Sequence, residues 1–259
     1  MRVALGIEYD GSGFQGWQTQ AGPRTVQACL ERALSRVADQ PLGVVCAGRT
    51  DAGVHATGQV VHIDTAARRA AHNWVLGGNS NLSSDVRIRW ATAVPEDFHA
   101  RFSASARRYL YQFYCAPVPS ALYRQRTAWS RVPLDIAAMQ AAAAALLGEH
   151  DFSSFRAAGC QARHPRRRVL ALQVVARGPL VRIEVTANGF LHHMVRNIAG
   201  VLLPIGRGER PPAWAGEVLA ARDRTRAATT APAQGLCLVQ VHYPERFGLP
   251  PAADIPVPV

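Results

Sequence analysis

Apolar residues recur along this chain with two alternating periods, one typical of helices and one typical of strands. Within residues 25–38 they fall three and four positions apart, which predicts an amphipathic helix with Thr25 as its N-cap. The other elements predicted for the first half are strands at residues 3–9, 42–46, 58–63 and 86–93 and a helix at residues 70–76.

The second half of the chain repeats this rhythm. Gly178-Pro179 separates two alternating runs and predicts a β-hairpin of residues 168–176 and 180–186. Its other predicted elements are strands at residues 109–115 and 236–242 and helices at residues 134–147, 190–205 and 214–221. Each half approximates β-α-β-β-α-β, which predicts two α+β units whose sheets join, with a cleft between them.

The predicted elements also suggest domain bounds and a cellular compartment. We expect an N-terminal half at residues 1–105, a C-terminal half at 106–245 and a poorly ordered Pro-rich tail at 246–259. The first residues resemble a strand rather than a signal peptide, and the longest apolar stretch is too short for a bilayer. Five widely spaced cysteines without a CxxC pair favour a reducing compartment, so we expect a cytoplasmic protein without membrane contact.

Charge narrows the chemistry. All 29 basic residues are arginine, against 18 acidic residues, which gives a net charge of +11. The absence of lysine excludes Schiff-base lysine chemistry and the Walker A and kinase lysines. The excess of positive charge indicates a polyanionic partner, most simply a nucleic acid.

Residues 11–16 match the G-x-G-x-x-G pattern after a predicted strand. In a dinucleotide fold the third glycine opens a helix and an acidic residue follows about 20 positions later, and both features are missing here. We therefore predict a flexible loop rather than a cofactor site. Rings and amides interleave in it, which suits an RNA-facing surface; they are Phe14, Gln15, Trp17, Gln18 and Gln20.

The most informative run is CAGRTDAGVHA at residues 46–56. Gly48 and Gly53 free the backbone on both sides of Asp51, and Arg49 lies close enough to keep that carboxylate ionised. The residues alone leave two interpretations open, a catalytic Asp51 or an Asx turn with Arg49 as a surface charge. A histidine such as His55 is more often a packing residue than a catalytic one.

The run resembles the GRTDAGVHA signature of the tRNA pseudouridine synthase A family (TruA). The resemblance extends over residues 5–244 and includes the segments YDGSGFQGWQTQ, FHARFSASARRYLYQFY, DFSSFRAAGC, GFLHHMVRNIAG and GLCLVQVHYP. Several motifs in the right order make it highly specific. Leu110, Cys237 and Ile63 depart from the family's common residues, which concerns substrate preference rather than the reaction.

The resemblance implies an α+β fold of two ferredoxin-like halves, related by a pseudo-twofold axis, with joined sheets around a central basic cleft. It implies a homodimer in which both subunits contact one tRNA. The implied reaction isomerises uridine to pseudouridine in the anticodon stem-loop, at tRNA positions 38, 39 and 40, and uses no cofactor and no metal. The alternative is a catalytically silent tRNA-binding module on the same scaffold.

The resemblance also assigns roles to individual residues. Asp51 is the essential aspartate, acting as a nucleophile at C1′ or as a base. Arg49 pairs with that carboxylate or with a phosphate beside the flipped base, and Arg196 pairs with the carboxylate. Tyr109 stacks on the flipped uracil and is a candidate for removing the C5 proton, while Leu236 packs against the base.

The remaining basic residues are candidate RNA contacts. We expect Gln18 and the clustered arginines to bind the tRNA backbone. The clustered arginines are Arg107, Arg108, Arg163, Arg166, Arg167, Arg168, Arg222, Arg224 and Arg226. A solvated surface is the alternative at each of these positions. His192 and His193 are expected within a helix, where adjacent side chains diverge, so we predict no metal site there.

Overall fold

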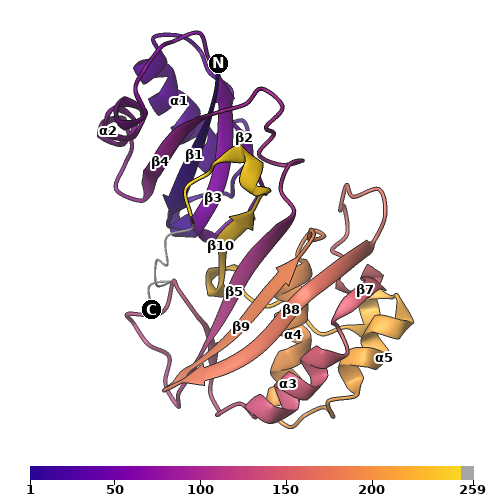
Figure 1. Ribbon diagram of the computed structural model, residues 1–259. Coiled ribbons are helices and arrows are strands. Elements are labelled where there is room, and N and C mark those ends of the chain that lie inside the picture. The colour runs from indigo at the N-terminus through magenta and orange to yellow at the C-terminus, as the bar shows by residue number, and fades with distance from the viewer. Residues whose placement is uncertain (252–259) are drawn as a thin grey trace. The chain divides into compact units, whose positions relative to one another are not determined.

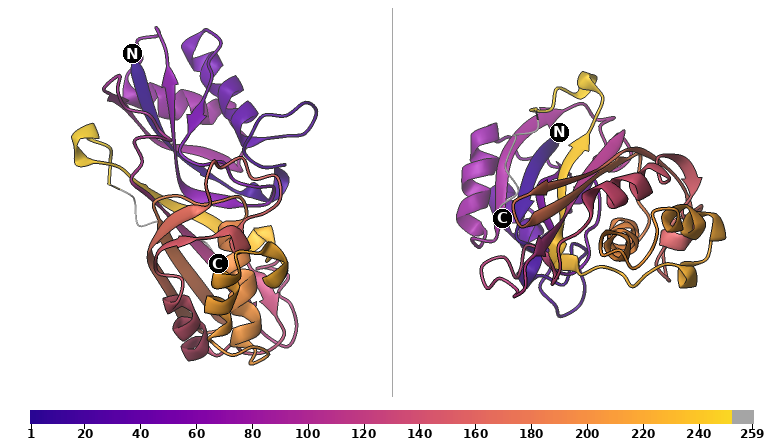
Figure 2. Two further views of the ribbon diagram at one scale, coloured as in Figure 1. Left: turned by 90° about the vertical axis from the view of Figure 1, so that its right-hand side faces the viewer. Right: turned by 90° about the horizontal axis from the view of Figure 1, so that it is seen from below.

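A computed structural model describes residues 1–251 (Figures 1 and 2). The chain divides into two compact units. Unit 1 contains residues 1–106 and the segment from Cys237 to the end of the described residues, and unit 2 contains residues 107–236. Both combine strands with helices, so the fold is a mixed one of helices and open sheet, as the α+β prediction requires.

Unit 1 follows the predicted β-α-β-β-α-β order. Strands β4, β1 and β3 are neighbours in that order and pair antiparallel, and β2 pairs antiparallel with β3. Its elements are β1 (Arg2–Tyr9), η1 (Gly11–Gly13), α1 (Val26–Ala38), β2 (Val45–Cys46), β3 (His55–Asp64), α2 (Ala71–Asn81) and β4 (Val86–Val94). This strand order places the first and last strands of the motif, β1 and β4, side by side, and α1 and α2 pack on each other.

The two helices of unit 1 differ in how well the pattern predicts them. In α1, the apolar face of Val26, Leu30 and Leu34 is buried as predicted, and Thr25 occupies the N-cap position without a side-chain capping hydrogen bond. In α2, the predicted end at residue 76 is wrong, because the helix continues through Gly78. A Cβ at Gly78 would lie 2.3 Å from Ile88 Cδ1, so packing against β4 explains a glycine inside the helix.

In unit 2 the strands β5, β9, β8 and β7 are neighbours in that order and pair antiparallel, and β6 pairs parallel with β5. The hairpin prediction is confirmed, since β8 and β9 pair antiparallel across Gly178 at φ +58°. The elements are β5 (Ala106–Cys115), β6 (Ala128–Ser130), α3 (Ile136–Ala144), β7 (Gly148–Asp151), η2 (Ser153–Phe155), β8 (Arg166–Arg177), β9 (Leu180–Ala187), α4 (Met194–Gly206), α5 (Trp214–Ala221), η3 (Arg224–Arg226) and η4 (Ala233–Gly235).

Two local predictions for unit 2 are corrected. The helix predicted over residues 134–147 ends at Ala144, and a short strand, β7, follows at Gly148, whose φ of +95° turns the chain. The helix predicted from residue 190 begins at Met194, because His193 has a left-handed backbone at φ +61°. Both breaks depend on single residues that the apolar period does not reveal.

The last strand, β10 (Leu236–His242), pairs parallel with β3 through Cys237–His55 and Leu238–Ala56. From Cys237 onward it belongs to unit 1, whereas the sequence pattern placed residues 106–245 in one C-terminal half. Pairing between strands so distant in the chain is not visible in a local pattern. None of the helices in residues 1–251 has the length and apolarity needed to cross a membrane.

The beginning of the predicted tail packs against unit 1. Phe247, in η5 (Glu245–Phe247), is 3% exposed, and its ring centre lies 5.1 Å from that of Phe98. Arg246 forms a 2.8 Å ion pair with Asp97. The expectation of poor order is therefore wrong for Arg246 and Phe247, while residues 252–259 lie outside the described part of the chain.

Candidate active site and RNA-contact residues

Asp51 lies in the turn between β2 and β3 of unit 1. The turn closes through a 3.1 Å hydrogen bond from the Val54 N–H to the Asp51 carbonyl, and Gly53 adopts a φ of +78°. Asp51 is half-buried, and the next residue, Ala52, is exposed. The backbone at Gly53 requires a residue that tolerates positive φ, as the sequence suggested.

Gln59, on β3, holds the first flank of this turn. Its fully buried side chain donates a 2.6 Å hydrogen bond to the Gly48 carbonyl and accepts a 3.4 Å hydrogen bond from the Gly48 N–H. The amide thus replaces a strand partner for Gly48. Gln59 was not predicted as part of the site, because a polar residue in a buried strand gives no local sign of its partner in the sequence.

The glycine-rich loop of residues 11–17 and Tyr9, at the end of β1, also hold the turn. Trp17 donates its N–H to the Thr50 carbonyl at 2.9 Å, and Tyr9 Oη lies 2.7 Å from Thr50 Oγ1. A Cβ at Gly11 would lie 2.0 Å from the Val54 carbonyl oxygen, and a Cβ at Gly16 would lie 2.9 Å from the Thr50 carbonyl oxygen. The two glycines therefore allow the loop to contact the Asp51 turn, main chain against main chain.

These contacts correct the prediction of a flexible, RNA-facing loop. The rings of Phe14 and Trp17 are 2% and 1% exposed, and Trp17 packs on Tyr9 with ring centres 5.9 Å apart. Gln15 remains exposed and Gln18 is half-buried. The aromatic residues serve the interior of unit 1, and only the polar part of the pattern faces solvent.

His55 follows the turn and is 5% exposed, in agreement with a packing role. Its Nδ1 lies 3.1 Å from the Gly11 N–H donor and 3.2 Å from Asp10 Oδ1. His55 therefore connects the end of the Asp51 turn to the start of the glycine-rich loop. The sequence offered no reason to pair Asp10 with His55, 45 positions apart.

Arg49 is exposed, and its guanidinium makes no hydrogen bond or ion pair with any residue in the described range 1–251. Of the two roles suggested by the sequence, this arrangement favours contact with a phosphate. The neighbouring Cys46 is no alternative nucleophile, because burial raises the pKa of its thiol to about 12.

Tyr109 and Tyr111 lie two positions apart on β5 and therefore on one face of the strand. The Tyr109 ring packs edge-on against Phe190, with centres 5.0 Å apart. Tyr111 is fully buried, donates its hydroxyl to the Pro232 carbonyl at 2.8 Å, and has a pKa raised by burial. The second tyrosine of the RRYLY motif is thus a core residue, which leaves Tyr109 as the candidate for chemistry.

Arg196 projects from α4 and is half-buried, while Val195 and Ile198 beside it are buried, as the predicted apolar face requires. Arg196 Nε donates a 2.8 Å hydrogen bond to the Ala231 carbonyl, and the Ala231 N–H donates to the Arg196 carbonyl at 3.2 Å. Leu236, 6% exposed, begins β10. The side chain of Arg196 is therefore oriented by the segment that precedes β10.

His192 and His193 do not diverge as residues of a helix would. Both precede α4, and the left-handed backbone of His193 brings the two ring centres to 4.0 Å. The prediction that these two side chains lie within a helix and diverge is therefore wrong.

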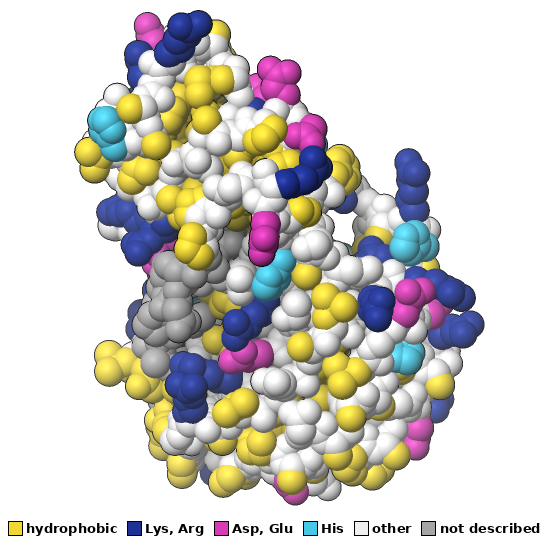
Figure 3. Space-filling model, viewed as in Figure 1, with side chains coloured by type: hydrophobic (Ala, Val, Ile, Leu, Met, Phe, Trp, Pro, Cys, Tyr) yellow, Lys and Arg dark blue, Asp and Glu magenta, His cyan; other side chains and the backbone are white. Residues whose placement is uncertain are grey.

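The structure separates the clustered arginines into two groups. Four make contacts within unit 2: Arg107 with Asn188, Arg108 in a salt bridge with Glu184, Arg167 with two carbonyls, and Arg224 with Asn197 and Thr230. Within the described residues, the side chains of the others make no hydrogen bond or ion pair; they are Arg163, Arg166, Arg168, Arg222 and Arg226. All five of these are exposed and available to a polyanion. Figure 3 shows arginine side chains, in dark blue, gathered on the right-hand side of the view, where Figure 1 places β7.

Comparison with known proteins identifies the class of this fold and site. A family model described as tRNA pseudouridine synthase matches residues 6–103 and 142–244. The chain therefore belongs to the tRNA pseudouridine synthase family, which is a family of isomerases.

Similar whole proteins narrow the assignment within that family. The tRNA pseudouridine synthase A of Methylococcus capsulatus is 58% identical over 249 residues, covering 96% of this chain and 92% of that protein. The protein of the same name from Nitrosococcus oceani is 58% identical over 250 residues, covering 96% of each chain, and that from Alcanivorax borkumensis is 56% identical over 250 residues, covering 96% and 94%.

Proposed function

We propose that this chain isomerises uridine to pseudouridine in the anticodon stem-loop of tRNA, at tRNA positions 38, 39 and 40, and that Asp51 carries the reaction. The observation behind the proposal is the Asp51 turn, held by Gln59 on one flank and by the glycine-rich loop on the other. A reacting group needs such a fixed backbone, because small displacements of a catalytic group slow a reaction strongly.

The reaction needs few groups. The N1–C1′ bond breaks, the uracil turns, C5 bonds to C1′, and the proton from C5 is removed while N1 regains one. In the proposal the Asp51 carboxylate acts at C1′ as a nucleophile or at the sugar as a base. Tyr109 stacks on the flipped uracil and is the candidate for the C5 proton, and Leu236 packs against the base.

The proposal gives the arginines separate roles. Arg196 pairs with the catalytic carboxylate of Asp51. Arg49, which is exposed two positions before Asp51, contacts a phosphate next to the flipped nucleotide. Gln18 and the exposed arginines of unit 2 contact the RNA backbone. Two ferredoxin-like halves with pseudo-twofold symmetry, a homodimer and a cytoplasmic location remain part of the proposal, as the family resemblance implies them.

Asp51→Asn tests the proposal. We expect no pseudouridine at positions 38–40 of an unmodified tRNA transcript, with tRNA binding retained, because the amide keeps the shape of the carboxylate and removes its charge. Asp39→Asn is the matched control: Asp39 is exposed, and its φ of +54° suits asparagine. Pseudouridine formation by the Asp51→Asn protein would refute the role of Asp51, and its absence with the wild-type protein would refute the function and favour a silent binder.

A further inference from the structure

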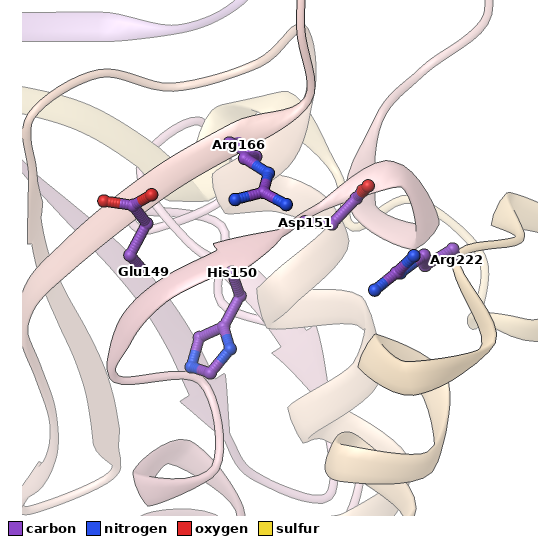
Figure 4. Close-up of a pocket in the computed structure, with 5 residues that line it drawn as sticks. All are labelled: Glu149, His150, Asp151, Arg166 and Arg222. Atoms are coloured by element: carbon purple, nitrogen blue, oxygen red, sulfur yellow. The ribbon is translucent and has the colours of Figure 1, made fainter.

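A pocket of about 180 Å³ lies on unit 2, and none of the residues assigned to the reaction is among those that line it (Figure 4). Glu149, His150 and Asp151 of β7 line it, together with Arg166, the first residue of β8, and Arg222, which follows α5. The fold thus brings together members of two arginine clusters, Arg166 and Arg222, which lie 56 positions apart in the chain.

Arg166 and Arg222 are both exposed, and within the part of the chain that the structure describes neither side chain forms a hydrogen bond or an ion pair. Figure 4 shows them on either side of Asp151. Both side chains line the same pocket, and each guanidinium offers a planar fork of N–H donors suited to an anion such as phosphate.

The acidic residues of the pocket have to be compatible with an anion. Asp151 Oδ1 accepts hydrogen bonds from the Ser153 N–H at 2.9 Å and from Ser153 Oγ at 2.6 Å. Burial raises the pKa of Asp151, but these bonds and the charges of Arg222 and Arg166 outweigh burial and lower it. The Asp151 carboxylate is therefore stabilised by hydrogen bonds from Ser153. Its negative charge also attracts the guanidinium groups of Arg222 and Arg166.

The backbone of Arg222 is a second independent sign of a specialised position. It adopts a φ of +50°, which is uncommon for a residue with a long side chain, while its N–H contacts the Leu219 carbonyl at the end of α5. Glycine or asparagine would be less strained there. An arginine at this point places a guanidinium at the pocket at some cost in backbone energy.

The net charge of unit 2 indicates that the ligand is part of a polyanion. Residues 107–236 contain 18 arginines and seven acidic residues, which is 18 − 7 = +11, the net charge of the whole chain. Further exposed arginines lie close in sequence to the two that line the pocket; they are Arg163, Arg168 and Arg226. We propose that Arg166 and Arg222 together bind one backbone phosphate of the tRNA, a contact that positions the RNA; the proposal rests on tRNA being the substrate.

The experiment compares two double variants in binding to an unmodified tRNA transcript. Arg166→Gln/Arg222→Asn removes the pocket arginines, with asparagine chosen because it tolerates the backbone at 222. Arg131→Gln/Arg177→Gln removes the same charge from two exposed arginines of unit 2 outside the pocket. We expect the dissociation constant of the pocket variant to rise about tenfold, the slope of log K against log salt to fall by about one, and the control to change at most about twofold.

The outcomes separate this inference from the proposed function. Equal weakening in the two double variants would show a general effect of charge and overturn the phosphate site, as would unchanged binding of the pocket variant or no tRNA binding by the wild-type protein. A wild-type protein that binds tRNA but forms no pseudouridine would refute the proposed reaction and leave the binding comparison valid.

Discussion

The two units of this chain differ most in charge. Unit 2 contains the whole excess of arginine, whereas the rest of the chain has 11 arginines and 11 acidic residues and is formally neutral. Several arginines of unit 1 are paired, as in Arg2–Asp64, Arg24–Asp85 and Arg246–Asp97. The neutral unit carries the Asp51 turn with the exposed Arg49, and the basic unit carries the five exposed arginines of the clusters that make no side-chain hydrogen bond or ion pair within the described residues.

This difference suggests how binding and chemistry are divided. Contacts with phosphate are long in range and depend on salt, whereas a catalytic carboxylate depends on a fixed local backbone. Changes around the Asp51 turn should therefore lower the rate and leave RNA affinity intact. Changes among the exposed arginines of unit 2 should do the opposite.

The largest effect is expected at Gly11. In Gly11→Ala the new Cβ would lie 2.0 Å from the Val54 carbonyl oxygen, so the glycine-rich loop and the Asp51 turn must separate. We expect the rate of pseudouridine formation at saturating tRNA to fall at least about 100-fold, with the tRNA dissociation constant unchanged. Single-turnover kinetics and a binding titration measure the two quantities.

Gly43→Ala is the control for Gly11→Ala, because a Cβ at Gly43 meets no atom within 4 Å. It should retain wild-type activity. If Gly11→Ala weakens tRNA binding and leaves the rate unchanged, the proposed division between the units fails.

A smaller effect on the same turn is expected for Gln59→Leu. Leucine cannot replace the hydrogen bonds to Gly48, so the half-buried N–H and carbonyl of Gly48 lose their partner. The free energy of unfolding should fall by about 1–3 kcal/mol, and the rate should fall with it. Chemical denaturation measures the loss, and Gln173→Leu, at an exposed strand position, should show little of it.

Arg224 and Arg226 test the basic unit within a single cluster. Arg224 Nη2 bonds to Asn197 Oδ1 and Thr230 Oγ1, so Arg224→Gln should lower the free energy of unfolding by about 1–3 kcal/mol. Arg226→Gln should leave stability unchanged, weaken tRNA binding a few-fold and reduce the salt slope by about one. If the two variants behave alike, the separation of the arginines into two groups is wrong.

The sequence pattern predicted elements well where a local period decides the structure. The bounds of α5 (Trp214–Ala221) and β10 (Leu236–His242) agree with the prediction, and α1 differs by one residue at its start. It failed where a distant contact decides. Gly78 lies inside α2 because of Ile88, and β10 joins unit 1 because it pairs with β3.

The candidate site shows the same limit. The signature around Asp51 marked the turn, but the residues that hold it are distant in sequence, as Tyr9 and Gln59 are. The prediction that the rings of the glycine-rich loop face RNA was wrong, because the burial of Trp17 depends on its contact with Thr50, which is distant in sequence. Charge runs likewise did not distinguish Arg224 from Arg226.

The smallest predicted effect concerns the pH dependence of unit 1. His62, on β3, is 3% exposed and accepts a 3.1 Å hydrogen bond from the Ala100 N–H on Nδ1, which requires a neutral ring nitrogen. Burial, with the charges of Arg2 and His99, lowers the pKa of His62 from 6.5 to about 4, against the opposing effect of Asp64. Between these pH values the unfolded chain binds a proton at His62 and the folded chain does not, so stability falls as the pH falls through this window.

The melting temperature should drop between about pH 6.5 and pH 4, and less so in His62→Asn, whose amide oxygen can accept the Ala100 bond and does not titrate. Part of the slope should remain in the variant, because the pKa of His99 is also lowered by burial. Equal slopes in the two proteins would exclude His62 as the titrating group. The stability of unit 1 would then depend on pH, whereas the arginines of unit 2 stay charged over this range, so the two units would differ in stability as well as in RNA binding.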